Sequence, residues 1–182
     1  MLDILKGFLP WILFSAFYGN TPEQFKTALW IALISTAILE RRNFKEGNIL
    51  SWVSLGYFLL LLVSCYFFPS NWLQTNMWAV SNLVLSAMAF GSYLVKQPFT
   101  YQYAKKQVPK ERWNSPLFIQ INNILTNIWG LIFLFTALID WVHVHYSPMS
   151  MVMFMVLNNI GWFVGIALSK TFPPYWKKIS KE

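Results

Sequence analysis

Residues 49–68 are 20 consecutive positions without a charged side chain, and this run constrains the fold more than any other feature. A helix rises about 1.5 Å per residue, so the run is about 30 Å long, which is the thickness of one bilayer core. The chain is 56% hydrophobic and only 12% charged, whereas a soluble domain carries about 25% charged residues. These features predict an all-α fold, a polytopic membrane helix bundle.

Apolar runs recur along the whole chain and predict six helical segments in one integral membrane domain over residues 1–182. Five of the runs are long enough to be interpreted as full spans. The first run is barely long enough to cross and contains Pro10, so we expect a short N-terminal span or a re-entrant segment there. The expected segments are residues 2–18, 22–39, 49–68, 76–95, 117–139 and 149–168.

Two segment ends have local signals. Thr21 and Gln24 have the spacing of a capping box, and Pro22 suits the first helical position, so the second helix is expected to begin there. Pro173 and Pro174 are expected to stop the last helix before the chain ends.

Basic residues are concentrated in three stretches between or after the apolar runs. Lys and Arg number three in residues 40–48, five in 96–116 and four in 170–182, which is twelve of the fourteen in the chain. The connections 70–75 and 141–150 have none. Because loops rich in Lys and Arg stay on the cytoplasmic side of a membrane, the loop 96–116 and the C-terminal tail are both predicted to be cytoplasmic.

The basic loop 96–116 is expected to lie on anionic lipid headgroups, which attract each nearby cation by about 1 kcal/mol. The net charge of +7 is therefore assigned to the membrane surface, and nucleic acid is excluded as a partner. Glu40, beside Arg41 and Arg42, is expected to form a surface ion pair. The headgroup-binding residues predicted in the loop are Lys96, Lys105, Lys106, Lys110 and Arg112.

Uncharged polar residues are unusually frequent in the fifth segment and recur in two others. A primary amide in hydrocarbon costs several kcal/mol unless it is hydrogen-bonded, so these side chains must face protein or water. Two interpretations stay open: a polar cavity that binds a substrate, and hydrogen bonds between helices that fix their register. The residues concerned are Asn82, Gln120, Asn122, Asn123, Thr126, Asn127, Asn158 and Asn159.

Two smaller patterns also have alternative interpretations. Gly161, Gly165 and Ser169 form a ridge of small residues that predicts close helix packing, with homodimerisation as the alternative. Asp140, His143 and His145 are weak candidates for a metal site, because two His at i and i+2 share a face only in an extended segment. The simpler interpretation is a solvated loop at the outer boundary.

Several patches of the sequence resemble the septation protein A family of small bacterial inner-membrane proteins. The resemblance covers residues 8–18, the short second helix, the Lys96-x-Pro98 loop, and the downstream Trp113 and Trp129. Poorly characterised relatives share a loop similar to the one here, built from Pro98-Phe99-Thr100, Tyr103-Ala104, Val108-Pro109, Trp113 and Ser115-Pro116. The resemblance implies a bacterial inner-membrane location and a role in envelope integrity and septation through partner membrane proteins, without catalysis.

Two hypotheses for the function follow, and neither needs a cofactor. The first is a non-enzymatic inner-membrane protein that acts through lipids or membrane partners in envelope and septation maintenance. The second is a small dimeric transporter or lipid-handling protein whose amides line a cavity for a neutral or zwitterionic substrate. A metal-dependent membrane enzyme using Asp140 and the histidines is a third, weaker class. The single Cys65 excludes an internal disulfide.

Overall fold

The computed structural model describes residues 6–19, 21–67, 71–147 and 150–179, and no strand occurs among them. Residues 2–5, 68 and 149 of the expected segments, and residues 180–182 of the basic tail, lie outside the described residues. The elements are α2 (Leu9–Phe17), α3 (Pro22–Leu39), α4 (Arg41–Lys45), α5 (Ile49–Phe67), α6 (Asn71–Thr75), α7 (Met77–Leu94), α8 (Phe99–Ala104), the 3-10 turns η1 (Lys105–Gln107) and η2 (Lys110–Arg112), α9 (Pro116–Tyr146) and α10 (Met151–Ile179).

Four of these helices, α5, α7, α9 and α10, are long and apolar enough to cross a membrane. The predicted all-helical fold with several membrane-spanning helices is therefore confirmed for the described residues. The count of five full spans stays a prediction. α3 has 18 residues but carries Glu23 and Lys26 in its first turns, and it is not among the four. α2 has nine residues, which is about 14 Å of helix and too short to cross.

The chain separates into two compact units, an N-terminal unit (Leu2–Asn71) and a C-terminal unit (Trp72–Glu182). In the N-terminal unit, aromatic side chains from α2, α3 and α5 form the core. The Trp11 ring stacks on Tyr57 with centroids 5.2 Å apart, and Phe14 lies 5.5 Å from Phe58. The indole of Trp11 also donates a 2.7 Å hydrogen bond to Ser54 Oγ, so its one polar atom is satisfied inside the core.

The start of α3 follows the local sequence as predicted. Thr21 Oγ1 accepts from the backbone N–H of Gln24 at 3.2 Å, and Gln24 Oε1 accepts from the backbone N–H of Thr21 at 3.3 Å. Pro22 occupies the first helical turn. The capping box is therefore confirmed, and it satisfies two of the N–H groups that a helix start leaves without intrahelical partners.

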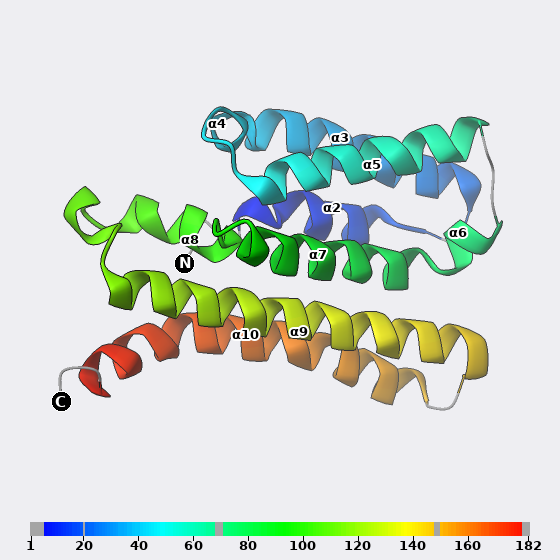
Figure 1. Ribbon diagram of the computed structural model, residues 1–182. Helices are drawn as coiled ribbons and strands as arrows, with labels where there is room; N and C mark the ends of the chain where they lie inside the picture. The colour runs from blue at the N-terminus through cyan, green and yellow to red at the C-terminus, as the bar shows by residue number, and fades with distance from the viewer. Residues whose placement is uncertain (1–5, 20, 68–70, 148–149, 180–182) are drawn as a thin grey trace. The chain divides into compact units, whose positions relative to one another are not determined.

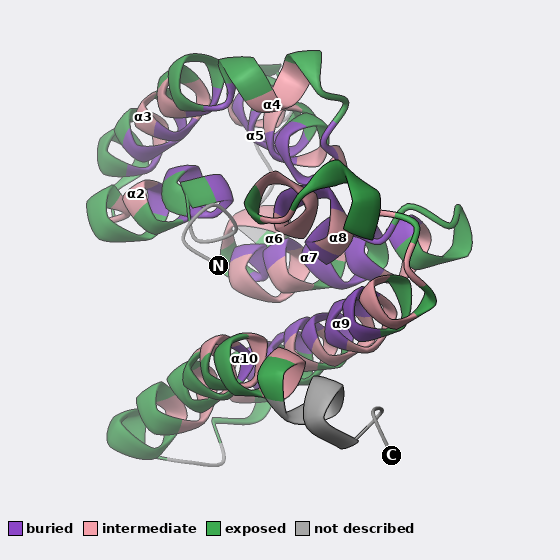
Figure 2. Ribbon diagram, turned by 90° about the vertical axis from the view of Figure 1, so that its left-hand side faces the viewer, coloured by how far each residue is buried: buried purple, intermediate pink, exposed green. Residues whose placement is uncertain are grey.

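In the C-terminal unit, α9 packs against both α7 and α10 (Figure 1). The side chains of α9 toward these neighbours include Trp129 and Phe133, which are at most 1% exposed. α10 is different, because only 6% of its apolar window is buried, and most of its surface is drawn as exposed in Figure 2. A helix that is apolar on its exposed faces is the composition expected of a surface in contact with lipid.

Two expected helix ends are wrong. Residues 141–150 were expected to form an external loop, but α9 continues to Tyr146 and ends at Ser147, whose φ is 43°. No Gly or Pro occurs between residues 131 and 147, so nothing in that stretch breaks the helix. Pro173 and Pro174 were expected to stop the last helix, but both lie inside α10, which runs to Ile179. Because proline has no N–H, the carbonyl groups four residues before Pro173 and Pro174 lose their usual intrahelical donors, but the helix continues.

Candidate functional site

The basic loop 96–116 is a folded structure anchored on α9. Phe99 and Tyr103 of α8 are completely buried. The backbone N–H of Phe99 donates to Ser92 Oγ at 3.0 Å. Thr100 Oγ1 donates to the backbone carbonyl of Asn122 at 2.8 Å and lies 2.7 Å from Thr126 Oγ1. These contacts fix the position of α8, so the lysines that follow it start from a defined backbone.

Trp113 closes the loop back onto itself. Its indole Nε1 donates to the backbone carbonyl of Lys105 at 2.9 Å and also lies 3.3 Å from the carbonyl of Val108. Tyr101 donates its hydroxyl to the backbone carbonyl of Trp113 at 3.4 Å. The indole therefore joins η1 to η2, and its polar atom is used to fix the loop.

Lysine ammonium groups lie over the rings of this loop. Lys105 Nζ is 5.6 Å from the Trp113 centroid and 5.9 Å from that of Tyr101, and Lys110 Nζ is 6.0 Å from the Trp113 centroid. Cations at these distances are attracted by the ring quadrupole. We call Tyr101, Lys105, Lys110 and Trp113 the Trp113 platform. Lys106 Nζ lies 5.5 Å from the separate ring of Tyr103.

The cations of the Trp113 platform have no acidic partner in the part of the chain that the structure describes. Among the residues that the structure describes, no carboxylate lies within ion-pair distance of Lys105, Lys110 or Arg112. Lys110 and Arg112 are exposed, as is Lys96, which follows α7 with a positive φ of 58°. Within the described residues, the charges of Lys105, Lys110 and Arg112 are therefore not paired with a carboxylate and are open to an external anion.

The predicted amides fall into two groups. Asn122, Asn127 and Asn159 each donate to the backbone carbonyl four residues earlier in their own helix, at 2.8–2.9 Å. Gln120 is exposed, Asn123 is half-buried, and Thr126 meets Thr100. These side chains are therefore not brought together around one point. Only Asn82 and Asn158, from different helices, converge.

Asn82 and Asn158 converge on Asp140. Asn82 Nδ2 donates to Asp140 Oδ2 at 2.9 Å, and Asn158 Nδ2 donates to Asp140 Oδ1. The carboxyl group is only 2% exposed. This Asp140 junction joins α7, α9 and α10, and each carboxylate oxygen receives one amide donor. A buried carboxyl group is stabilised where such donors replace water.

The two histidines of α9 serve different neighbours. The ring of His143 stacks on Phe154 with centroids 4.0 Å apart, and His143 interacts electrostatically with Asp140. A ring nitrogen of His145 lies 2.9 Å from Asn76 Oδ1 at the start of α7. The described residues contain no group of three or more His, Cys, Asp or Glu side chains placed to hold a metal ion. Because His145 contacts Asn76 rather than Asp140 and His143, the three residues of the metal hypothesis are not brought together.

The small-residue ridge of α10 faces α9 within the same chain. A methyl group added at Gly165 would lie 2.8 Å from the Trp129 ring, and one added at Gly161 would lie 2.9 Å from Ile132. Ser169 Oγ accepts a 3.0 Å hydrogen bond from the indole of Trp129. The ridge lets the two helices approach closely, so a homodimer would have to use another surface.

A second buried carboxylate lies in the N-terminal unit and was not foreseen. Glu40 was expected in a surface pair with Arg41 or Arg42, but it is only 1% exposed. Its Oε2 accepts from Ser51 Oγ and Asn43 Nδ2, both at 2.6 Å. The expectation is wrong because α4 folds back toward α5 and brings Ser51 over the acid. We call these contacts the Glu40 junction.

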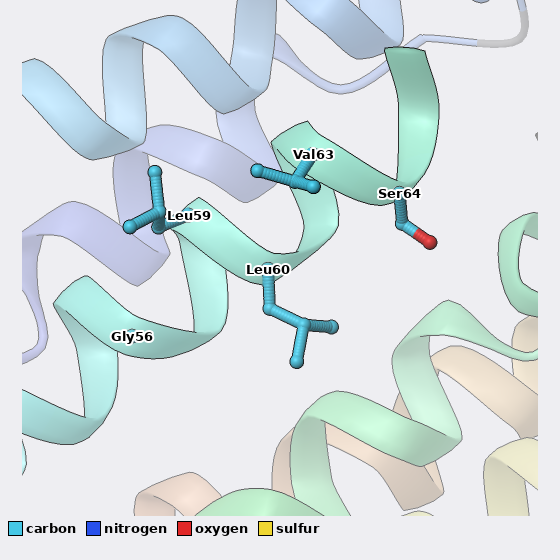
Figure 3. Close-up of a pocket in the computed structure, with 5 residues that line it drawn as sticks. All are labelled: Gly56, Leu59, Leu60, Val63 and Ser64. Carbon is cyan, nitrogen blue, oxygen red and sulfur yellow. The ribbon is translucent and has the colours of Figure 1, made fainter. Parts of the chain in front are cut away.

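A hollow lies along one face of α5 and is lined by Gly56, Leu59, Leu60, Val63 and Ser64, as Figure 3 shows. Four of these residues are apolar. None of the predicted amides is among them, so this hollow is not the polar cavity that the transporter hypothesis requires.

Searches of the chain against protein-family models, curated proteins and solved structures gave no match. The class is therefore defined by the structure itself: an all-helical protein with four helices able to cross a membrane.

Proposed function

We propose that this chain is a non-enzymatic, multi-pass protein of the bacterial inner membrane that acts through anionic lipids and membrane partners in maintaining the envelope and septum. The observation that carries the lipid part is the Trp113 platform, in which two lysines with no acidic partner among the described residues lie over one indole ring. Trp is enriched at the headgroup level, where its ring is amphipathic. The septation part rests on the sequence resemblance alone.

The orientation follows from the ends of the C-terminal unit. The end of α7, the basic loop, the start of α9 and the later part of α10 lie together at one end. Lys96, Arg112 and Lys170 belong to this end, whereas the end with Asp140 and the histidines has no Lys or Arg in the described residues. By the positive-inside rule, the basic end and the C-terminus face the cytoplasm.

The transporter hypothesis has less support from the amides. A polar cavity needs donors and acceptors that remain available to a substrate. The side-chain amides of Asn122, Asn127 and Asn159 instead each donate an N–H to a backbone carbonyl of their own helix. Those of Asn82 and Asn158 donate to Asp140. These contacts favour the interpretation that the amides fix helix register.

Lipid binding by the purified full-length protein tests the proposal. In detergent, native mass spectrometry would compare phosphatidylglycerol with phosphatidylcholine, which have similar chains and differ in net charge. We expect phosphatidylglycerol to bind more tightly, because each nearby Lys or Arg contributes about 1 kcal/mol toward an anionic surface. Equal binding of the two lipids would contradict the proposal, and uptake of a neutral solute by proteoliposomes would favour transport instead.

The role in septation has its own test. A fluorescent fusion of the full chain, produced in the native bacterium, should concentrate at the division site, and deletion of the gene should lengthen the cells. Uniform membrane fluorescence together with normal cell length would contradict this part of the proposal and leave the lipid part standing.

A further inference from the structure

We propose that the Trp113 platform is a binding site for a lipid with two phosphates, of the diphosphatidylglycerol type, on the cytoplasmic leaflet. This inference rests on the proposed lipid function and names the headgroup that the site selects. Its basis is the pairing of Lys105 and Lys110 around a single ring, with centroid distances of 5.6 and 6.0 Å. Two cations that lie over one ring match two phosphates joined by one glycerol.

The platform is organised before a ligand binds. Trp113 is fixed through its Nε1 hydrogen bond to the carbonyl of Lys105 and through the hydroxyl of Tyr101. The two lysine heads lie over rings that are already in position. A flexible lysine loses rotamer entropy when it binds an anion, and a side chain already confined loses less.

The surroundings favour a doubly charged headgroup over a singly charged one. Glu111 is the only acid in residues 96–116, and in the described chain it forms no ion pair with Lys105, Lys110 or Arg112. One phosphate can neutralise only one of the two platform lysines. A lipid with two linked phosphates can contact both lysines. Once the first phosphate is bound, the second is held close to the other lysine, so its effective concentration there is high.

The platform also lies where such a lipid would be. Phe99 and Tyr103 attach α8 to the helices, and α9 begins at Pro116, three residues after Trp113. The ring is therefore close to the start of a candidate span, at the level of the headgroups. Basic sites at the cytoplasmic ends of membrane helices are the kind that bind such lipids.

The test measures lipid binding to the full-length protein in detergent by native mass spectrometry, with diphosphatidylglycerol and phosphatidylglycerol supplied at equal phosphate concentration. The test variant is Lys105→Gln with Lys110→Gln, which leaves the backbone carbonyl that accepts from Trp113. The matched control is Lys170→Gln with Lys177→Gln in α10, which removes the same charge outside the platform and leaves the other predicted headgroup residues of the loop in place.

We expect one diphosphatidylglycerol to bind the wild type and the control with similar affinity. The platform variant should bind it about 30-fold more weakly, the effect of two headgroup contacts of ordinary strength. Equal loss in both variants, or equal affinity of the wild type for the two lipids per phosphate, would overturn the inference and leave the proposed lipid function intact. If neither anionic lipid binds better than phosphatidylcholine, both proposals fail.

Discussion

The Asp140 junction and the Glu40 junction meet the same physical requirement in two ways. Each is formed by an acidic residue that is at most 2% exposed and that forms no salt bridge with Lys or Arg among the described residues. Glu40 receives its donors from residues 3 and 11 positions away, so its junction is formed by one turn and the helix that follows. Asp140 receives its donors from residues 58 and 18 positions away, on two other helices.

The difference shows what each acid holds together. Losing the donors of Glu40 would disturb the connection from α3 to α5. Losing the donors of Asp140 would remove one hydrogen bond between α9 and α7 and one between α9 and α10, and would leave those of Ser86 to Gly130 and of Trp129 to Ser169. Since a buried charge without donors is costly, the Asp140 junction favours one register of three helices, whereas the Glu40 junction favours one conformation of a turn.

The largest expected effect comes from removing both amide donors of Asp140. In the variant Asn82→Leu with Asn158→Leu, the carboxylate stays buried without a donor on either oxygen. We expect the free energy of unfolding to fall by about 3–5 kcal/mol, the usual cost of leaving a buried charge uncompensated. Unfolding in mixed detergent and dodecyl sulfate micelles, followed by circular dichroism, measures it.

The control for this variant removes the charge as well. Adding Asp140→Leu makes the whole junction apolar, and replacing a buried polar group together with its partners is close to neutral. We therefore expect the triple variant to recover most of the lost stability. If the triple variant is less stable than the double variant, the cost comes from packing and the explanation by buried charge is wrong.

The Glu40 junction should give a smaller effect for one lost donor. Ser51→Ala removes the 2.6 Å hydrogen bond to Glu40 Oε2 and leaves Asn43 in place. A hydrogen bond to a charged group contributes about 1.5–3 kcal/mol, so we expect a loss of about 2 kcal/mol in the same assay. Hydrogen exchange should rise around α4 and the start of α5 and stay unchanged in α9. Faster exchange in α9 would contradict a local role.

Close packing of α9 and α10 can be tested by comparing a glycine at their contact with a glycine that has open space around it. Gly165→Ala places a methyl group 2.8 Å from the Trp129 ring, whereas Gly56→Ala in α5 meets no atom within 4 Å. Overpacking costs about 1–3 kcal/mol, and alanine regains about 0.5–1 kcal/mol of helix propensity. We expect Gly165→Ala to lose about 1 kcal/mol, and Gly56→Ala to be neutral or stabilising. Similar results for the two substitutions would show that the ridge is not closely packed.

Local features of the fold could be predicted from the sequence, and features that depend on neighbouring helices could not. The capping box at Thr21 and the apolar span at residues 49–68 depend only on adjacent residues, and both were found. The partners of Asp140 could not be found, because nothing in the sequence of α9 indicates which helices lie beside it. Asn82 and Asn158 were identified as polar residues needing partners, but the partner was not.

The basic loop shows the same limit within one segment. Its charge and position were evident from Lys105, Lys106 and Lys110, whereas the placement of Trp113 between η1 and η2 depends on backbone carbonyls that no sequence pattern reports. Glu40 was misinterpreted for a related reason. Two adjacent arginines indicated a surface pair, but burial is decided by the direction of the turn and by Ser51, 11 residues later.

The smallest expected effect compares two glutamates of that same turn. Glu46 accepts a 2.8 Å contact from Arg42, whose side chain is 85% exposed, whereas Glu40 is buried with neutral donors. Exposed ion pairs contribute about 0–1 kcal/mol and are screened by salt. We expect Glu46→Gln to change the unfolding free energy by less than about 0.5 kcal/mol, and this small change should vanish at high salt.

Glu40→Gln should cost more, and its cost should be insensitive to salt, because water and ions do not reach the carboxyl group. A larger loss for Glu46→Gln than for Glu40→Gln would mean that the exposed pair, rather than the buried acid, fixes the turn between α3 and α5.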